Sequence, residues 1–525
     1  MNKRYIIYII ILCLYAVELN AQGIATKSYY SFKRIEDKTP WLTSLNGTGL
    51  IYNTIENSFS TVGAYFKNIN GDYRNYNEAK EINNFGLATK SYTRINNFYF
   101  YGSFNYDYTI NNNIAWAGTA YTNTNINPIL DSIPGKSTRE AYIINAKAAY
   151  KFSQLFSAGA TFNYKTATLA KKNDGRNKND FSNLYISPGI NFTTKYINIG
   201  ANLSYEHNAE QVKYDYFGDI TGKYLCYMEG LFMYSISPIT LATITERRYE
   251  KDIMGGSLQF QLKLGNFSFY NNFIVERGKE DDFEDNMLKK RYAKVETLNY
   301  NYSGEFKYSF NCMENLLKIK YLSYEELSYG IVNNYEQIPN ENNMWEYYEY
   351  GSVLRYMSQI QKFGIEYNGF IKENDYLSKV DFTVGYNYTK SNKKEKIFPA
   401  EYSQNYKVSN YYASVNKNFL FGLNIVKLNV CGGFSMGSGV PLVESNPITT
   451  GAIKLNKELL YHDYAYKVSN SYRIGCGVNY SHIINKQKGQ VISLEFSYLY
   501  SKLNKFIELA KSNRNLLNVS MEFNF

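Results

Sequence analysis

Asn-Leu-Leu-Asn-Val-Ser-Met-Glu-Phe-Asn-Phe, residues 515–525, ends the chain and decides its fold class. Every second residue of this stretch is apolar and lies on one face of an extended chain: Leu517, Val519, Met521, Phe523 and Phe525. The residues between them are polar. A period of two with one apolar face indicates a half-buried β-strand, and about 9–11 residues suffice for a tilted strand to cross a bilayer.

The same terminal residues resemble a known targeting signal. Val519, Met521 and Phe523 lead to a terminal aromatic residue, Phe525. This ending resembles the C-terminal signal of Gram-negative outer-membrane β-barrels, which the barrel-insertion machinery reads. The resemblance implies an outer-membrane protein and names that machinery as a partner.

Strand-like alternation recurs along the whole chain. Segments with alternating apolar and polar residues include 98–108, 158–164, 197–205, 258–264, 300–308, 382–388 and 494–500. We expect an all-β fold, a single antiparallel transmembrane β-barrel over residues 44–525. We estimate roughly 18 strands, with about 14 to 20 possible, since bacterial barrels have even numbers. Short links should be periplasmic turns, and long links such as 171–180 and 391–407 should be extracellular loops.

The N-terminus has the pattern of a secretory signal peptide. Lys3 and Arg4 precede an uncharged apolar run over residues 5–17, which is too short for a transmembrane helix. We expect residues 1–21 to be removed after Ala21. Export leads to the outer membrane, where lipid and lipopolysaccharide would surround the barrel.

Composition supports this class. Aromatic residues make up 17% of the chain, with 55 Tyr, and membrane barrels carry aromatic girdles at both interfaces. A soluble sandwich or propeller also alternates, but the export signal, the Tyr excess and Phe525 argue against it. The net charge of +10 is modest and suggests no nucleic-acid partner. A basic rim could meet anionic lipid head groups, although ordinary solvated loops are the simpler interpretation.

Residues 22–43 lack clean alternation and lead into Trp41, Asn46 and Gly49. This pattern resembles the approach to the first strand in an uncharacterised, Tyr-rich family of outer-membrane barrels from gut-type Gram-negative bacteria. Thr48 stands where that family often has Ala. In that family, as in fatty-acid transporter barrels, the segment before an Asn-x-x-Gly element can enter the lumen. The resemblance therefore implies lumen insertion, and a periplasmic tail is the alternative.

No catalytic pattern emerges from the sequence. An outer-membrane phospholipase needs His and Ser two residues apart on one strand face, and His207, His462 and His482 have no such Ser. We expect no enzyme activity, no cofactor and no metal. The remaining candidates are charged residues that the alternation places on the inward face of a strand. In a conducting pore they would set ion selectivity: Lys263, Lys427, Arg473 and Glu495.

The sequence thus favours a channel or transporter for a small or amphiphilic solute. A plug domain of about 130 residues, as in energised nutrient receptors, does not fit before Trp41. The alternative is a non-transporting role as a surface-binding, envelope or secretion assembly component. An open lumen would favour transport, and a filled lumen would favour the alternative.

Overall fold

The computed structural model describes most of the chain beyond the expected signal peptide. Described are residues 32–525, apart from 54–57, 123, 174, 217, 219–220, 222, 239–244, 285–289, 338–343, 374–376, 449–450, 486–488 and 504–511. The expected signal peptide, residues 1–21, lies outside the described residues.

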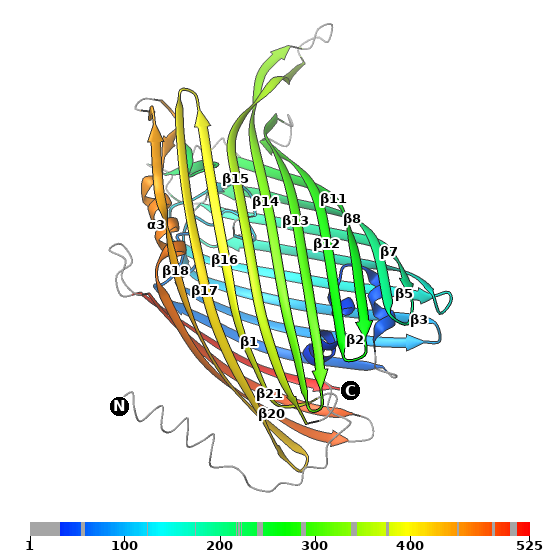
Figure 1. Ribbon diagram of the computed structural model, residues 1–525. Helices are drawn as coiled ribbons and strands as arrows, with labels where there is room; N and C mark the ends of the chain where they lie inside the picture. Colours follow the sequence, from blue (N-terminus) through cyan, green and yellow to red (C-terminus); the bar gives the residue numbers. More distant parts are fainter. Residues whose placement is uncertain are drawn as a thin grey trace, which may run out of the picture.

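One 18-stranded antiparallel sheet forms the molecule and closes on itself (Figure 1). Its strands are β1 (Phe59–Gly71), β2 (Glu81–Ile95), β3 (Phe98–Ile114), β5 (Gly135–Lys151), β6 (Phe156–Lys171), β7 (Arg176–Thr193), β8 (Ile197–Asp215), β11 (Thr245–Leu264), β12 (Phe267–Glu284), β13 (Lys290–Phe310), β14 (Met313–Gln337), β15 (Trp345–Lys372), β16 (Ser378–Ile397), β17 (Ala400–Phe421), β18 (Asn424–Ser445), β20 (Ser471–Asn485), β21 (Gln490–Leu503) and β22 (Asn513–Asn524). This architecture confirms the predicted barrel and its strand number.

Smaller elements accompany the barrel. A four-stranded sheet contains β4 (Ile129–Leu130), β9 (Tyr224–Glu229), β10 (Met233–Pro238) and β19 (Lys454–Leu455). The helices are α2 (Phe32–Lys38), the 3-10 helices η1 (Pro40–Thr43) and η2 (Gly47–Tyr52), and α3 (Lys457–Val468). None of the helices in the described ranges is long and apolar enough to cross a membrane.

The last strand closes the barrel against the first. β22 pairs with β1, with Asn524 opposite Thr61. One step further, Ser60 and Phe525 exchange two backbone hydrogen bonds of 2.9 Å. Phe525 therefore belongs to the closing pair of strands. We call this end of the barrel the short-turn end, because tight turns such as 265–266 and 422–423 lie there, and the opposite end the long-loop end.

An apolar belt surrounds the short-turn half of the barrel. Along β11 the outward residues from Leu264 back to Met254 are apolar or glycine, and Leu258 is 63% exposed. Asp252 and Glu250 then take over the outward positions. The belt thus covers about 11 residues, the length needed for a tilted strand to cross a bilayer. The remaining part of β11 continues beyond it.

Aromatic side chains mark the lower edge of this belt. Phe152, Phe156, Tyr196 and Phe310 lie at or beside the tight turns, and all are more than half exposed. Exposed rings at one level are typical of the aromatic girdle at a membrane interface. The outer surface of the barrel is therefore that of an outer-membrane β-barrel.

Two of the expected long links are wrong. Residues 391–407 are not a long loop, because β16 and β17 continue to a tight turn at 398–399, and 171–180 contains only the short link 172–175. Above the apolar belt the outward face is polar, so the alternation disappears while the strands continue. The first strand of the barrel begins at Phe59, and residues 44–53 form η2 and its flanks.

Candidate functional site: a lumen closed from both ends

Residues 32–53, here called the lumen segment, fill part of the barrel interior. Figure 1 shows their helices inside the barrel, enclosed by its strands and near the short-turn end. Trp41 and Leu50 are each 1% exposed, and Asn46 is completely buried. The partners of this segment include residues of β3, β5, β6, β7, β8, β11 and β14, so the segment lies inside the barrel rather than below it.

Local sequence explains the shape of the lumen segment. Pro40 occupies the start of η1, where the missing N–H of proline costs nothing. Asn46 caps η2: its Oδ1 accepts hydrogen bonds from the backbone N–H of Thr48 at 3.1 Å and from the Thr48 hydroxyl at 2.7 Å. Gly49 passes so close to Trp41 that a Cβ there would lie 2.0 Å from the Trp41 carbonyl oxygen.

The same Asn46 side chain holds the segment to the wall. Its Nδ2 donates to the backbone carbonyls of Ile190 at 3.2 Å and Ala201 at 3.3 Å, and to Gln259 Oε1 at 3.0 Å. Trp41 Nε1 donates to Gln261 Oε1 at 2.8 Å. Buried polar atoms that lose such partners are costly, so Asn46 and Trp41 fix the position of the segment.

Glycines let the segment approach the wall closely. A Cβ at Gly159 would lie 2.8 Å from Thr48 N, and one at Gly189 would lie 2.4 Å from Asn46 Oδ1. A Cβ at Gly200 would lie 2.8 Å from the Trp41 ring. Glycines on the neighbouring strands β6, β7 and β8 thus form the seat for the segment.

Charged groups add to this attachment. Lys147 Nζ donates to the carbonyls of Leu42 and Ser44, both at 2.8 Å. Asp37 pairs with Lys318 at 2.9 Å, and Arg34 pairs with Glu314. Burial raises the pKa of Glu36 in α2, against the opposing effect of Lys90 and Lys147. All of these contacts are non-covalent.

At the long-loop end, inserted loops close the lumen. Their four-stranded sheet and α3 share one apolar cluster, with Leu231, Met233 and Leu460 completely buried. Tyr356 and Tyr402 of the barrel wall complete this cluster. Apolar burial therefore holds the loops against the inner wall.

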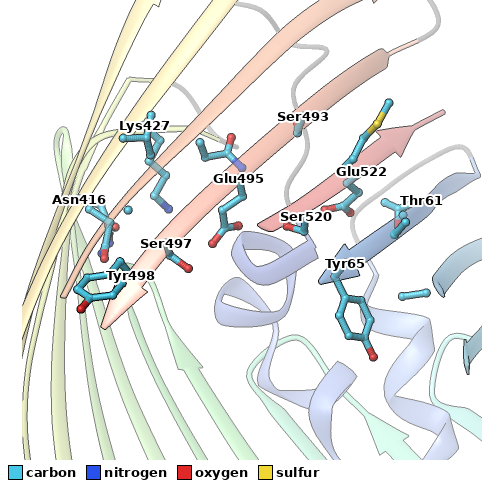
Figure 2. Close-up of a pocket in the computed structure, with 18 of the residues that line it drawn as sticks. Thr61, Tyr65, Asn416, Lys427, Ser493, Glu495, Ser497, Tyr498, Ser520 and Glu522 are labelled. Atoms are coloured by element: carbon cyan, nitrogen blue, oxygen red, sulfur yellow. Dashed lines mark hydrogen bonds between the residues drawn. The ribbon is translucent and has the colours of Figure 1, made fainter. Parts of the chain in front are cut away.

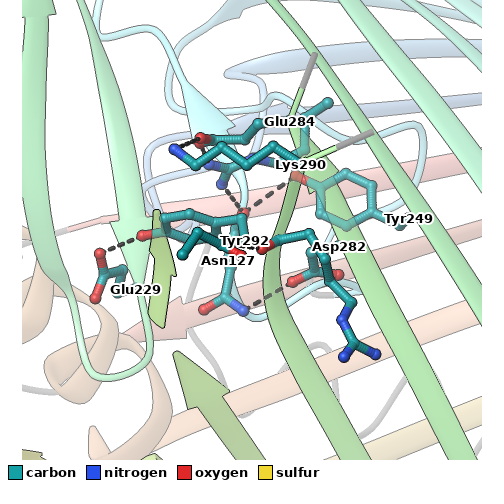
Figure 3. A network of polar contacts seen from close by, with 10 residues as sticks. Asn127, Glu229, Tyr249, Asp282, Glu284, Lys290 and Tyr292 are labelled. Carbon is teal, nitrogen blue, oxygen red and sulfur yellow. Dashed lines mark hydrogen bonds and ion pairs between the residues drawn. The ribbon is translucent and has the colours of Figure 1, made fainter. Parts of the chain in front are cut away.

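A polar network attaches the loop before β4 to the wall (Figure 3). Asn127 Nδ2 donates to Asp282 Oδ2 at 2.8 Å, and the Asn127 carbonyl accepts from Arg247 Nη1 at 2.5 Å and from the Tyr249 hydroxyl at 3.1 Å. Arg247 also pairs with Glu284. Asp282 and Arg247 are completely buried, so the network lies in the interior of the barrel.

Helix α3 is anchored by a buried carboxylate. Asp463 accepts a hydrogen bond from Asn75 Nδ2 at 2.9 Å and pairs with Lys467 at 2.6 Å. Burial alone would raise the pKa of Asp463, but Lys467 and Lys393 outweigh it and hold the pKa below its usual range. This carboxylate therefore stays charged at neutral pH and stabilises α3 against the wall.

A cavity of about 750 Å³, lined by both polar and apolar groups, lies beside these closures. It is lined by β1, β2, β17, β18 and β20 to β22, and Figure 2 shows Lys427 and Glu495 pointing into the same space. Among the hydrogen bonds and ion pairs of the described residues, none involves either side chain. The cavity thus presents a cation and a carboxylate to whatever occupies it.

The structure places the predicted site residues as follows. Strand register puts all four inward candidates on the face that carries the lumen contacts, but only Lys427 and Glu495 share the cavity. Lys263 lies 5.1 Å from the Tyr52 ring of the lumen segment, and Arg473 lies further along β20. Trp41, Asn46 and Gly49 meet inside the barrel. Val519, Met521, Phe523 and Phe525 follow the outward face of β22.

Sequence reasoning missed the partners of the lumen segment. Parity marks Gln259 and Gln261 as inward, but nothing in the sequence pairs them with Asn46 and Trp41. Lys147, Thr161 and Lys318 were missed for the same reason, since contacts across a lumen leave no local pattern. Within the described ranges, no group of three His, Cys, Asp or Glu side chains is arranged to hold a metal.

The solved structures that this chain resembles include a receptor, a transporter and a channel. The chain is 8% identical to the ferric preacinetobactin receptor BauA from Acinetobacter baumannii, over 90% of this chain and 80% of that one, with a TM-score of 0.38. It is 9% identical to the outer membrane transporter YddB from Escherichia coli, over 88% of this chain and 80% of that one, with a TM-score of 0.38. It is 8% identical to a deltaS2S3 mutant of the monoaromatic hydrocarbon channel TodX, over 92% of this chain and 93% of that one, with a TM-score of 0.31. Structural similarity at this level gives no information about function.

No curated protein matches the sequence. The expected membership in an uncharacterised family is confirmed, while the gut-type habitat of that family stays a prediction. Over residues 48–525 the chain matches the family of unknown function DUF6850, and it belongs to that family.

Proposed function

We propose that the protein is an outer-membrane channel or transporter for a small or amphiphilic solute, and that the lumen segment is its gate. One observation carries this proposal: a non-covalently held segment occupies the lumen beside a cavity of about 750 Å³. A segment needed only for stability would not need to leave so large a space beside it. The lining of this cavity combines polar and apolar groups, which suits a small or amphiphilic solute. The short-turn end would face the periplasm and the long-loop end the exterior.

Conductance of the full mature chain tests this proposal. We would compare it in planar bilayers with a chain that lacks residues 22–53, after checking by heat-modifiable gel migration that both form barrels. We expect rare, brief openings for the mature chain and steady conductance after the deletion. Silence of both proteins would contradict passage. Equal, steady conductance of both would support passage and contradict gating.

Lumen charge should set ion selectivity. Replacing Lys427 with Glu places a second carboxylate beside Glu495, so we expect the open lumen to shift toward cations. The measurement is the reversal potential in a salt gradient, using the deletion background. Lys417→Gln is the matched control, because Lys417 faces outward and lies over the Phe419 ring. Equal shifts in both variants would show that Lys427 does not line the conducting path.

A surface or assembly role is the second candidate function. Beyond residue 331, β14 pairs only with β15, and this hairpin rises above the rest of the barrel (Figure 1). Trp345 is 48% exposed and Tyr350 is 64% exposed there. Exposed aromatic side chains on a projecting hairpin favour a protein partner. Loss of a phenotype on shortening this hairpin, with conductance unchanged, would support this role.

We also propose that the barrel-insertion machinery recognises β22 through Phe525. The support is the position of Phe525 in the closing strand pair, where its backbone bonds Ser60.

A further inference from the structure

Two lysines face each other on the outer wall of the barrel. Lys390 of β16 lies directly opposite Lys407 of β17. Both point outward, because their neighbours Ser391, Tyr406 and Val408 are buried on the inner face. Like charges in directly opposite strand positions repel each other and destabilise the sheet. A pair of this kind therefore calls for a compensating anion.

The protein itself does not supply that anion. In the described part of the chain, no ion pair or hydrogen bond involves the side chain of Lys390 or Lys407. A second outward pair, Lys178 opposite Lys213 on β7 and β8, is different. There Lys178 pairs with Asp180 and Lys213 with Glu246, each at 3.6 Å. The wall thus neutralises one lysine pair and leaves the other without a carboxylate.

The level of the uncompensated pair is informative. On β16 the outward residues from Val380 to Tyr388 are apolar or aromatic, and Lys390 is the next outward residue. On β17 the apolar belt ends at Tyr411, shortly before Lys407. The two ammonium groups therefore lie just beyond the belt on the long-loop side, where phosphates of a bilayer leaflet would lie.

Nearby side chains suit a phosphorylated sugar head group. Gln361 of β15 lies beside Lys390, and Asn392 and Asn405 form the next outward pair. Lys394 and Lys396 continue the basic stripe, with Glu401 as its carboxylate, 4.0 Å from Lys394. Amides bond hydroxyl and phosphate oxygens, and lysines attract phosphate as point charges.

We propose that Lys390 and Lys407 bind a phosphate of an outer-leaflet phosphoglycolipid, the lipid A part of lipopolysaccharide. The acyl chains would lie along the apolar belt below the pair, and the sugar would contact Gln361, Asn392 and Asn405. This inference rests on the outer-membrane placement proposed above, but not on passage through the lumen.

Binding of lipid A to the full mature chain in detergent tests the site. The probes are bisphosphorylated lipid A, the same lipid without phosphates, and inorganic phosphate, measured by native mass spectrometry with titration. We expect K390Q/K407Q to bind bisphosphorylated lipid A about 30-fold more weakly, since each lysine at an anionic surface contributes about fivefold. The matched control K178Q/K213Q and the charge-preserving K390R/K407R should bind normally.

Several results would overturn the assignment. These are unchanged binding in K390Q/K407Q, an equal loss in K178Q/K213Q, or equal binding of the dephosphorylated lipid. Competition by inorganic phosphate at the affinity of lipid A would assign the pair to free phosphate. Heat-modifiable migration identifies a variant that fails to fold, and the single variant K407Q, at an exposed position, then takes its place. Conductance on the same samples keeps the two proposals apart, because a silent barrel that still binds lipid A contradicts only passage.

Discussion

Replacing Asn46 with alanine should open the lumen. The change removes three hydrogen bonds to the wall, two of them to the backbone carbonyls of Ile190 and Ala201, and removes the cap of η2. Buried partners and a cap together should amount to about 3 kcal/mol, or roughly a hundredfold shift toward the released segment. The open probability in planar bilayers measures this shift directly.

A second variant separates the cap from the wall contacts. Asn46→Ser keeps a side-chain oxygen for the Thr48 N–H, because serine is a good N-cap residue, but it is too short to reach the wall. We expect an open probability between those of Asn46→Ala and the unchanged chain. Trypsin cleavage at Lys38 should increase in the same order. An Asn46→Ala protein that stays as closed and as protected as the unchanged chain would refute the gate.

Methyl groups added to the glycine seat should expel the segment without any change to the sequence of the segment itself. In Gly189→Ala and Gly200→Ala the new Cβ atoms would lie 2.4 Å from Asn46 Oδ1 and 2.8 Å from the Trp41 ring. Neither glycine has a positive φ, so alanine strains no backbone angle there, and the effect depends only on the space available for the methyl group. Overpacking costs about 1–3 kcal/mol at each site. The double variant should therefore conduct steadily, like the chain without residues 22–53.

The control for this experiment is another strand glycine. Nothing lies within 4 Å of a Cβ added at Gly102, so Gly102→Ala should leave conductance unchanged. The barrel of the double variant should still shift on gels when heated, because strand pairing is untouched. A double variant that folds but remains closed would show that the segment tolerates displacement without leaving.

The sequence predicted most of the barrel because its physics is local. Below the polar region, a strand between lipid and lumen needs apolar and polar residues in alternation, and Leu258, Phe260, Leu262 and Leu264 show that pattern plainly. The prediction failed at 391–407 because both faces of the strands are polar there. Asn46 and Gly49, part of the expected lumen-entry motif, lie at the start of a 3-10 helix ahead of the first strand.

By itself, the sequence determined the barrel, an approximate strand number and the inward direction of Lys263, Lys427, Arg473 and Glu495, since side-chain direction in a strand follows from counting by two. Only the tertiary structure decided which of them meet. Lys427 and Glu495 share a cavity because β18 and β21 are separated by one strand, whereas Lys263 contacts Tyr52 across the lumen. Closure of the barrel brings residues hundreds of positions apart in the sequence to the same height along the barrel axis. No local sequence pattern specifies which of these residues come into contact.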